Sequence, residues 1–524
     1  MKRQYFLRTR PSPARERGAA TVAVLLLMVV FTGLGLAMLR ASGMHLMING
    51  FRKFSALLDC ASEDGLKRGL HDLTAWLETE GLLAAVPAER VEAMREDGRA
   101  AFPLLLEDAL GGAFPRTLEE SFDGMTWESR ATCAFEGLAD MGGYLRIAAT
   151  LRIEASGGMA QVRAKRLSVL EGSLGLLAGR LPLPAIPLYI EGDMAGGEKA
   201  AFARENGIAL PAKPGQLVGA GLAASEGGVL PGDAGELAAR AMAIGVFRPG
   251  DLSAARLREA LGLAPSTDPV PDGVYLIRND LGLGGIFVQG DLDEMVLAIR
   301  GDAQIVLFRA GGAEWRVEWS PVESRTEFAS PEASELFDLI PLPIVFVNGA
   351  IAALGGGAVG LDGRVEMCFD GETPAVLDGV DLTIVSTDRV TIASHLILEG
   401  VRWQDGIPYS KDTEAQLVVY SAGQDVITGE ATDGGIAVAG GAPDDLKLQA
   451  SLTAASGGFL IEGAEKAVEL LGALHTDAYD GNGNRLTLYR DDRAAAGKFP
   501  RNAPLTAEPR LAVYSLKVLS WKEY

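Results

Sequence analysis

The chain has 524 residues, of which 48% are apolar, 22% are charged and 6% are aromatic. Its formal net charge of −21 argues against a general nucleic-acid-binding protein, because neutralising phosphate groups requires clustered lysine and arginine. The length allows two to four domains, each with its own core. Three cysteines are too few for a fold built on disulfides. An exported chain could still form one bridge, and Cys60 with Cys133 is the favoured pair, although their spacing does not decide it.

The first 18 residues form a basic leader, in which lysine and arginine greatly outnumber the single acid, Glu16. Residues 19–39 follow as an uncharged apolar run. A helix of this length extends about 31 Å, which is enough to cross the hydrocarbon core of a bilayer. The run is longer than the apolar core of a cleaved secretory signal, which has about 7–15 residues. We therefore expect a retained, single-pass transmembrane helix in the inner membrane, with a cytoplasmic N-terminus and the bulk of the chain periplasmic or extracellular.

This helix is predicted to continue beyond the membrane. From Met47 to Leu77 apolar residues recur in steps of three and four, which is typical of one face of a helix, and charged residues occupy the other face. Residues 40–80 are therefore predicted as an amphipathic continuation, giving one helix of about 60 residues and roughly 90 Å. Small side chains in the apolar run would let another helix approach closely; these are Gly33, Gly35 and Ala37.

This N-terminal region resembles the PilX-type minor pilins of type IV pilus and type II secretion-like assemblies. The similar residues are Arg17–Gly18, the apolar run, and the segment NGFRKFSALLDCASEDGLKRGL at 49–70. In that segment, Ser62, Glu63, Asp64 and Gly65 are similar to a small-acid-x-Gly motif that closes the membrane-proximal helix of the family.

The resemblance implies how the chain is processed and what it contacts. A prepilin peptidase is expected to cut between Gly18 and Ala19, and the retained helix is expected to pack against other pilins or pseudopilins. Major pilins carry glutamate at the fifth mature position, where this chain has Ala23. This departure favours a minor pilin at a filament tip or in an initiation complex.

Residues 81–170 are predicted to form a pilin-like α+β region. Residues 82–111 have a helical pattern, and residues 144–170 alternate apolar and polar side chains around Gly157–Gly158, which predicts a β-hairpin with its turn at the two glycines. Residues 171–270 are rich in proline and glycine and are predicted as a connector. Two helices are expected within it, at 236–246 and 251–263, the second with Asp251 as N-cap.

Residues 271–524 are predicted to form a β-rich domain, because short apolar runs alternate with turns of Gly, Asn, Asp and Ser. Runs such as GGIFVQGDL (284–292) and PIVFVNGAI (343–351) have a strand–turn–strand form that suits a partly solenoid-like domain of stacked turns. Their spacing is irregular, so a β-sandwich is the alternative. These runs also resemble the large C-terminal regions of some PilX-type proteins. The predicted fold class of the whole chain is α+β.

No catalytic motif emerges from the sequence. The four histidines are far apart, and GGGAVG (355–360) fits the spacing of a dinucleotide-binding loop but is followed by a predicted turn and strand instead of a helix. A loop between strands is therefore expected there. A weak calcium candidate consists of Asp480, Asn482, Asn484 and Asp491; however, Arg485 occupies the sixth place, where an EF-hand loop needs glycine, so a hairpin turn is favoured.

The sequence thus predicts a membrane-anchored pilin-like assembly protein without enzymatic activity or cofactor. Its expected partners are other pilins, a prepilin peptidase and the inner membrane, with a surface ligand of the C-terminal domain left open and no nucleic acid. One alternative is an adhesin whose β-rich domain binds a ligand. The other is a glycan-active enzyme with a β-helix groove.

Overall fold

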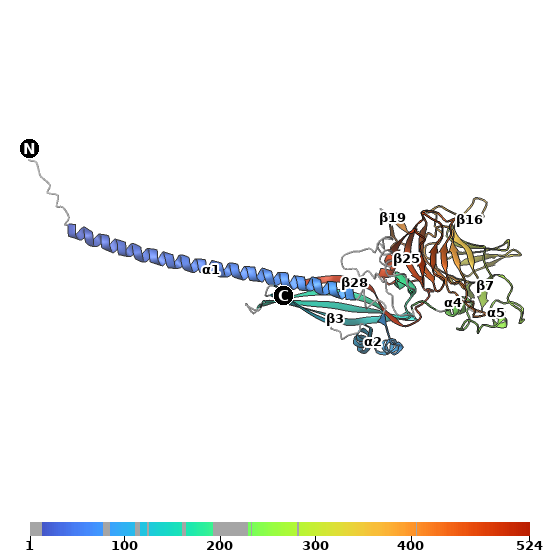
Figure 1. Ribbon diagram of the computed structural model, residues 1–524, viewed down its shortest axis with the longest axis horizontal. Helices are drawn as coiled ribbons and strands as arrows, with labels where there is room; N and C mark the ends of the chain where they lie inside the picture. Colours follow the sequence, from blue (N-terminus) through green and yellow to red (C-terminus); the bar gives the residue numbers. More distant parts are fainter. Residues whose placement is uncertain are drawn as a thin grey trace, which may run out of the picture.

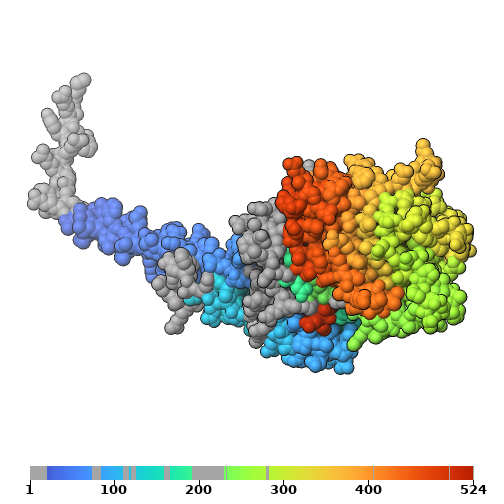
Figure 2. All heavy atoms as spheres, turned by 45° about the vertical axis from the view of Figure 1, so that its right-hand side comes forward, coloured from blue at the N-terminus to red at the C-terminus, as the bar shows by residue number. Residues whose placement is uncertain are grey.

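The computed structural model describes residues 13–76, 84–109, 116–122, 125–159, 164–191, 229–231, 233–279, 282–404 and 406–523. A long helix, a six-stranded sheet and a larger β-rich domain follow one another along the longest axis of the molecule (Figure 1). Figure 2 shows the bulk of the β-rich domain at one end and the helix projecting from the other. The predicted α+β class is confirmed.

Helix α1 runs from Pro13 to Trp76 without interruption, so the prediction of one helix that continues beyond the apolar run is confirmed. It is long and apolar enough to cross a membrane. The helix agrees with the predicted continuation over residues 40–80 as far as Trp76, and it does not close at the Ser62–Gly65 motif as the family resemblance implied. Residues on both sides of Gly65, including Leu58, Leu66 and Leu73, are buried, and this packing against the sheet keeps the last turns helical.

The six-stranded sheet is antiparallel, with the strand order β1-β28-β5-β4-β3-β2. Its strands are β1 (Ala84–Ala85), β2 (Arg116–Phe122), β3 (Met125–Asp140), β4 (Tyr144–Met159), β5 (Ala164–Gly179) and β28 (Arg510–Glu523). Helices α1 and α2 (Ala88–Ala109) share a core with one face of this sheet. Alternate residues of β4 from Leu145 to Ala155 are buried in that core, whereas Arg146 and Arg152 between them are exposed. The alternation is the period of two that a half-buried strand requires.

The predicted turn at Gly157–Gly158 is wrong, because both glycines lie within β4 and pair with Arg166 and Lys165 of β5. Gly157 faces α1. A Cβ atom at this position would come within 2.9 Å of both the Leu58 carbonyl oxygen and the Ser62 nitrogen. The glycine therefore serves the close approach of helix and sheet rather than a change of chain direction.

The last strand, β28, lies next to β5 in this sheet. Residues 510–523 therefore belong structurally with the region at 81–170, which corrects their expected place in a domain at 271–524. The β-rich domain is inserted between β5 and β28. Its two connections run side by side, since Leu181 donates from its N–H to Thr506 Oγ1 over 2.9 Å and accepts from the Thr506 N–H over 2.8 Å.

The predicted connector contains the two expected helices, α4 (Gly235–Ala241) and α5 (Ala254–Ala260). The N-cap of α5 is Ser253, whose hydroxyl accepts from the Arg256 N–H over 3.3 Å, so the expected cap Asp251 is wrong by two residues. A 3-10 turn η2 (Leu183–Ala185) and strand β6 (Leu188–Ile190) precede the helices. Much of the connector, residues 192–228, lies outside the described residues.

The β-rich domain has two main sheets, and the strands of its stacked turns alternate between them along the chain. The first sheet holds β7 (Gly273–Asn279), β8 (Gly282–Gln289), β14 (Ile344–Asn348), β17 (Asp381–Ser386), β21 (Gln416–Ser421), β23 (Lys447–Ala454), β25 (Ala467–Thr476) and β27 (Arg485–Arg490), with β6 beside β25. The second holds β9 (Glu294–Arg300), β15 (Ile351–Val359), β18 (Val390–Ile392), β22 (Ile436–Val438), β24 (Phe459–Ile461) and β26 (Tyr479–Asp480). Neighbours are parallel from β8 to β27 and from β9 to β26. Stacked turns produce this pairing, whereas an antiparallel sandwich does not.

Shorter elements interrupt the stacked turns. An antiparallel meander extends the second sheet beyond β9; it consists of β10 (Ala303–Ala310), β11 (Ala313–Ser320), β12 (Arg325–Ala329) and β13 (Ser334–Phe337). The remaining elements are β16 (Val365–Met367), the pair β19 (Arg402–Gln404) and β20 (Ile407–Tyr409), and α6 (Asp492–Ala495). Because the meander separates the first turn from the second, the sequence spacing of the strands is irregular.

The domain has a continuous apolar core between its sheets, while α4 and α5 pack in a second core with Phe287, Phe346 and Tyr420. The GGGAVG segment does not form the expected loop, since residues 355–357 lie inside β15. A Cβ atom at Gly356 would come within 2.7 Å of the His395 carbonyl oxygen, so the glycines allow neighbouring backbone to pack closely.

Candidate functional site

The N-terminal half of α1 carries a large exposed apolar surface. Its bulky side chains are exposed from Val22 to Phe51, and Phe51 itself retains 75% of its accessible surface. The predicted packing residues Gly33 and Gly35 lie in this surface, where a Cβ atom would meet no other atom within 4 Å. Ala37 is likewise exposed. The fold thus leaves this whole segment available to lipid or to other helices.

The exposed apolar surface is longer than a bilayer requires. The helix from Thr21 to Phe51 extends about 45 Å, whereas the hydrocarbon core is about 30 Å thick. At 100° per residue, Met44, Met47, Ile48 and Phe51 lie on the side of the helix that farther along packs against the sheet. We call these four residues the membrane-proximal stripe. Nothing in the described part of the chain covers it.

The predicted cleavage residues Gly18 and Ala19 lie inside α1, near its N-terminal end. The environment of their side chains lies outside the described residues. The structure therefore places the predicted scissile bond at the start of the exposed helix without testing cleavage.

The residues of the family-like motif join α1 to the sheet. Ser62 is fully buried; its hydroxyl donates to the Asp59 carbonyl over 3.0 Å and accepts from the Ser168 hydroxyl over 2.9 Å. A Cβ atom at Gly65 would lie 3.3 Å from the Trp127 ring. Glu63 instead forms a solvent-exposed ion pair with Lys67 over 2.7 Å. Two members of the motif thus contribute to helix–sheet packing.

Sequence reasoning missed two further glycines of this contact. Gly69 faces Ser129 so closely that a Cβ atom would overlap the serine hydroxyl, and Gly157 approaches α1 from the sheet. The spacing of four between Gly65 and Gly69, which puts both on one helix face, was the available signal.

The possible disulfide between Cys60 and Cys133 is not formed. Both thiols are free, and Cys60 is exposed on α1. Cys133 packs against the core of the six-stranded sheet, where burial raises the pKa of its thiol to about 12. The alternation of side chains along β3 turns Cys133 inward, away from the solvent that Cys60 faces.

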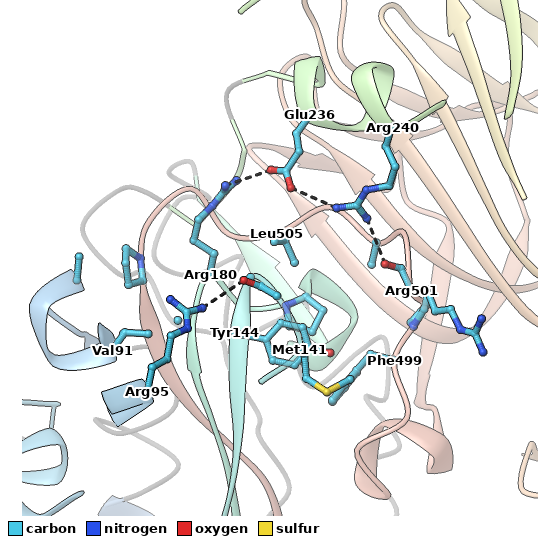
Figure 3. Close-up of a pocket in the computed structure, with 18 of the residues that line it drawn as sticks. Val91, Arg95, Met141, Tyr144, Arg180, Glu236, Arg240, Phe499, Arg501 and Leu505 are labelled. Atoms are coloured by element: carbon cyan, nitrogen blue, oxygen red, sulfur yellow. Dashed lines mark hydrogen bonds and ion pairs between the residues drawn. The ribbon is translucent and has the colours of Figure 1, made fainter. Parts of the chain in front are cut away.

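A cleft of about 570 Å³ lies where the six-stranded sheet meets the inserted domain (Figure 3). Its walls come from α2, the β3–β4 turn, the end of β5, α4 and the segment returning toward β28. Glu236 accepts from Arg180 over 3.2 Å and from Arg240 over 3.3 Å. Across the cleft, Arg95 donates to Asp140 over 2.9 Å and to Glu92 over 3.0 Å. Hydrogen bonds from the Gly142 N–H and from Arg95 hold the pKa of Asp140 below its usual value, so this carboxylate stays ionised.

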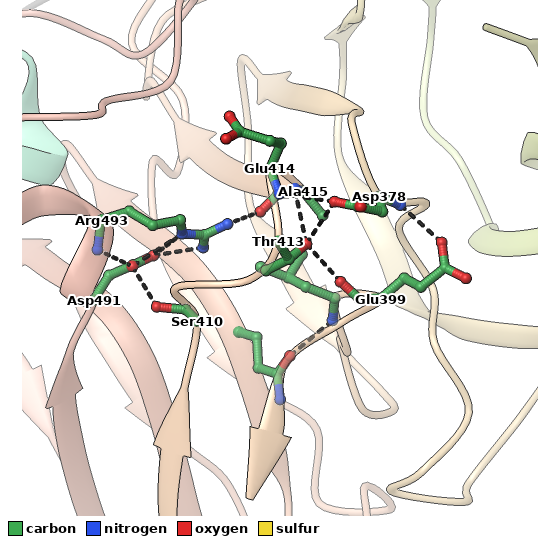
Figure 4. A network of polar contacts seen from close by, with 10 residues as sticks. Asp378, Glu399, Ser410, Thr413, Glu414, Ala415, Asp491 and Arg493 are labelled. Carbon is green, nitrogen blue, oxygen red and sulfur yellow. Dashed lines mark hydrogen bonds and ion pairs between the residues drawn. The ribbon is translucent and has the colours of Figure 1, made fainter. Parts of the chain in front are cut away.

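The structure does not gather the calcium candidates into one site. Asp480 accepts from the Asn482 N–H over 2.8 Å, while the Asn484 amide accepts from the Lys466 N–H over 2.8 Å, as turn residues do. Asp491 instead pairs with the buried Arg493 and accepts from the Ser410 hydroxyl over 2.7 Å (Figure 4). In the described ranges, no cluster of three His, Cys, Asp or Glu side chains is arranged to hold a metal ion.

The network around Asp491 continues to other turns of the inserted domain (Figure 4). Arg493 also donates to the Ala415 carbonyl, and the Glu414 N–H donates to Asp378 over 2.7 Å. Burial opposes ionisation of Asp378, yet hydrogen bonds from Glu414 and Thr413 hold its pKa below its usual value. These acids are engaged in joining neighbouring turns, which is a structural role.

Comparisons of the chain with protein-family models, with curated proteins and with solved structures found no match.

Proposed function

We propose that the chain is a non-enzymatic pilin-like assembly protein, placed at the tip or in the initiation complex of a type IV pilus or a related secretion system. In this proposal, residues 19–39 first lie in the inner membrane and α1 then packs laterally against the helices of other pilins or pseudopilins. The inserted domain stays on the far side of the membrane.

The exposed length of α1 is the observation that carries this proposal. Exposed apolar side chains continue along one side of α1 for about 15 Å beyond a bilayer of about 30 Å, so the membrane-proximal stripe needs a protein partner to exclude water from it. An ordinary membrane anchor has no reason to keep four large apolar side chains exposed beyond the membrane. Packing against parallel helices would bury both this stripe and the small residues Gly33 and Gly35.

Processing provides the first test. The mature N-terminus is determined in cells with and without a prepilin peptidase. We expect it to begin at Ala19 when the peptidase is present and at Met1 when it is absent. A chain that begins at Met1 in both strains, or at Met44 in either, contradicts the proposal.

The position in the filament follows from the shape of the chain. The inserted domain forms a broad mass at the end of the molecule opposite the helix N-terminus (Figures 1 and 2). A domain of this breadth favours a position that occurs once per filament, such as the tip, over a position that is repeated along a thin filament. Immunogold labelling of the inserted domain should mark filament tips or the cell envelope. Labelling along whole filaments would contradict a tip or initiation role.

A further inference from the structure

The cleft between the six-stranded sheet and the inserted domain has the size and position of a ligand site. Its volume of about 570 Å³ lies within the range of small-molecule pockets, and such pockets occur preferentially where domains meet. Several separate segments of the chain contribute to its walls (Figure 3). No residue of α1 lines the cleft. Assembly through the exposed half of α1 therefore does not account for the cleft.

The polar groups of the cleft are held in place by one another. Arg180 donates to Glu236 and also to the Thr506 carbonyl over 3.1 Å, while Arg240 donates to Glu236 and to the Arg501 carbonyl over 3.3 Å. A guanidinium has five N–H donors, and the described bonds of Arg180 use only its Nε and one Nη. The Arg180 and Glu236 side chains keep 42% and 38% of their accessible surface. Fixed donors and acceptors therefore lie side by side and within reach of a ligand.

The guanidinium groups of the cleft are already paired, which bears on the chemistry of its ligand. Arg180 and Arg240 pair with Glu236, and Arg95 pairs with Glu92 and with Asp140, which lies outside the lining. Arg501 also lines the cleft, but its side chain points away from the other guanidinium groups (Figure 3). A phosphate or another strong anion would have to compete with these carboxylates for the guanidinium groups. A hydroxyl group, in contrast, donates to a carboxylate and accepts from a guanidinium at the same time.

Apolar and aromatic side chains complete the lining. Tyr144 and Phe499 are half-buried at the cleft, and Met141 beside them is 50% exposed. Such side chains offer apolar surface to the C–H groups of a ligand whose polar groups bond elsewhere. Neighbouring hydroxyls together with apolar C–H faces are the combination found in sugars.

From this arrangement we propose that the cleft binds an uncharged oligosaccharide, with its hydroxyls shared between Glu236 and the guanidinium groups of Arg180 and Arg240. This function goes beyond assembly through α1 and does not depend on it. A glycan-binding site would then lie at the junction between the six-stranded sheet and the inserted domain, on the far side of the membrane.

The test uses the full-length protein in lipid nanodiscs, because glycosidic detergents carry sugar head groups. Maltotriose, cellotriose and N,N′,N″-triacetylchitotriose are titrated by calorimetry, with trigalacturonate as a charged comparison. At least one neutral trisaccharide should bind with a Kd of about 1 mM or tighter, equivalent to at least about 4 kcal/mol. Ala88→Trp, which places a large ring at the cleft wall on α2, should weaken binding at least tenfold. Ala100→Trp, at an exposed site of the same helix outside the cleft, is the matched control and should leave binding unchanged.

A second variant, Glu236→Gln, removes the shared charge while keeping an acceptor and should weaken binding about tenfold. The site proposal is overturned if no neutral trisaccharide binds with a Kd of about 1 mM or tighter. Binding of trigalacturonate alone, or equal affinity in wild type and Ala88→Trp, would overturn it as well. Mature N-terminus determination is independent of these titrations, so failure of the glycan site is distinguishable from failure of the assembly proposal.

Discussion

Gly157 illustrates at the residue scale how α1 is seated on the sheet, and it yields a stability prediction. A methyl group at Gly157 would press on backbone atoms of Leu58 and Ser62, which cannot move without shifting the helix. We expect Gly157→Ala to lower the free energy of unfolding by about 1–3 kcal/mol, the usual cost of overpacking. Urea unfolding of the full-length protein in detergent, followed by tryptophan fluorescence, measures this change.

Gly137 is the matched control, because it lies in the neighbouring strand β3 and a Cβ atom there would meet nothing within 4 Å. Gly137→Ala should leave stability unchanged or raise it by up to about 1 kcal/mol, by restricting the unfolded chain. Equal effects of the two substitutions would show that Gly157 has no special contact with α1.

His475 gives the inserted domain a predicted sensitivity to acid. The ring is fully buried, contacts the Ile186 carbonyl over 2.6 Å and the Thr453 hydroxyl over 3.1 Å, and burial lowers its pKa to about 4. In the unfolded chain the His475 imidazole has an ordinary pKa near 6.5 and is protonated below that pH. In the folded chain it stays neutral until the pH falls to about 4, so acid favours the unfolded chain. Stability is therefore unaffected above about pH 6.5 and should fall by about 3 kcal/mol as the pH drops to about 4.

Unfolding midpoints between pH 4 and pH 8 measure this dependence. His475→Gln retains a donor and an acceptor but does not titrate, so it should lose this part of the pH dependence while other groups keep theirs. Parallel stability–pH curves for wild type and His475→Gln would contradict the assignment.

At the element scale, α1 combines two contacts on one side of the helix. Toward the C-terminus this side packs on the sheet, and toward the N-terminus it becomes the membrane-proximal stripe. Met47→Arg places a charge in the stripe without touching the folded core, because Met47 is 73% exposed. We expect thermal stability to be unchanged and copurification with pilin-like partners to fall at least tenfold, since a buried unpaired charge is costly.

Asn49→Arg is the matched control, because Asn49 is exposed on another side of the same helix segment. It should retain partner copurification in cross-linked membranes. Similar losses in Asn49→Arg and Met47→Arg would indicate a general effect of charge rather than a packing surface.

At the scale of the whole molecule, the C-terminal strand joins the first and last parts of the chain. β28 lies between β1 and β5, and Leu511, Val513 and Leu516 enter the core beneath α1 and α2. Removing residues 510–524 should therefore unfold the six-stranded sheet, although the other five strands lie more than 300 residues earlier in the sequence. Limited proteolysis should then cleave within β4 and β5 at least tenfold faster, while the inserted domain stays resistant.

Removing only residues 520–524 provides the control, because Trp521 and Lys522 at the end of β28 are exposed and outside the core. This shorter deletion should preserve the resistance of β4 and β5. Resistance of the sheet in the longer deletion would show that β28 is dispensable for its fold.

Local sequence patterns by themselves determined the parts of this protein that depend on near neighbours. The uncharged run at 19–39 and the helical period after it were sufficient to predict α1, because both signals repeat along one helix. The short apolar runs of the β-rich domain likewise predicted strands, since each run needs only alternation and a turn. The sequence singled out the small-acid-x-Gly residues as a group, but it did not indicate that Ser62 and Gly65 contact the sheet while Glu63 faces solvent.

Only the tertiary structure decided which distant segments meet. The pairing of β28 with β5 joins residues separated by more than 300 positions, and no local period records such a partnership. The same holds for Gly157, which has the appearance of a turn residue until α1 is placed against it, and for Cys60 and Cys133, which share a domain but face opposite environments. The cleft arises where several segments converge, so its arginines and carboxylates had no common signature in the sequence. Burial and close approach depend on the whole chain, whereas periodicity depends on a few consecutive residues.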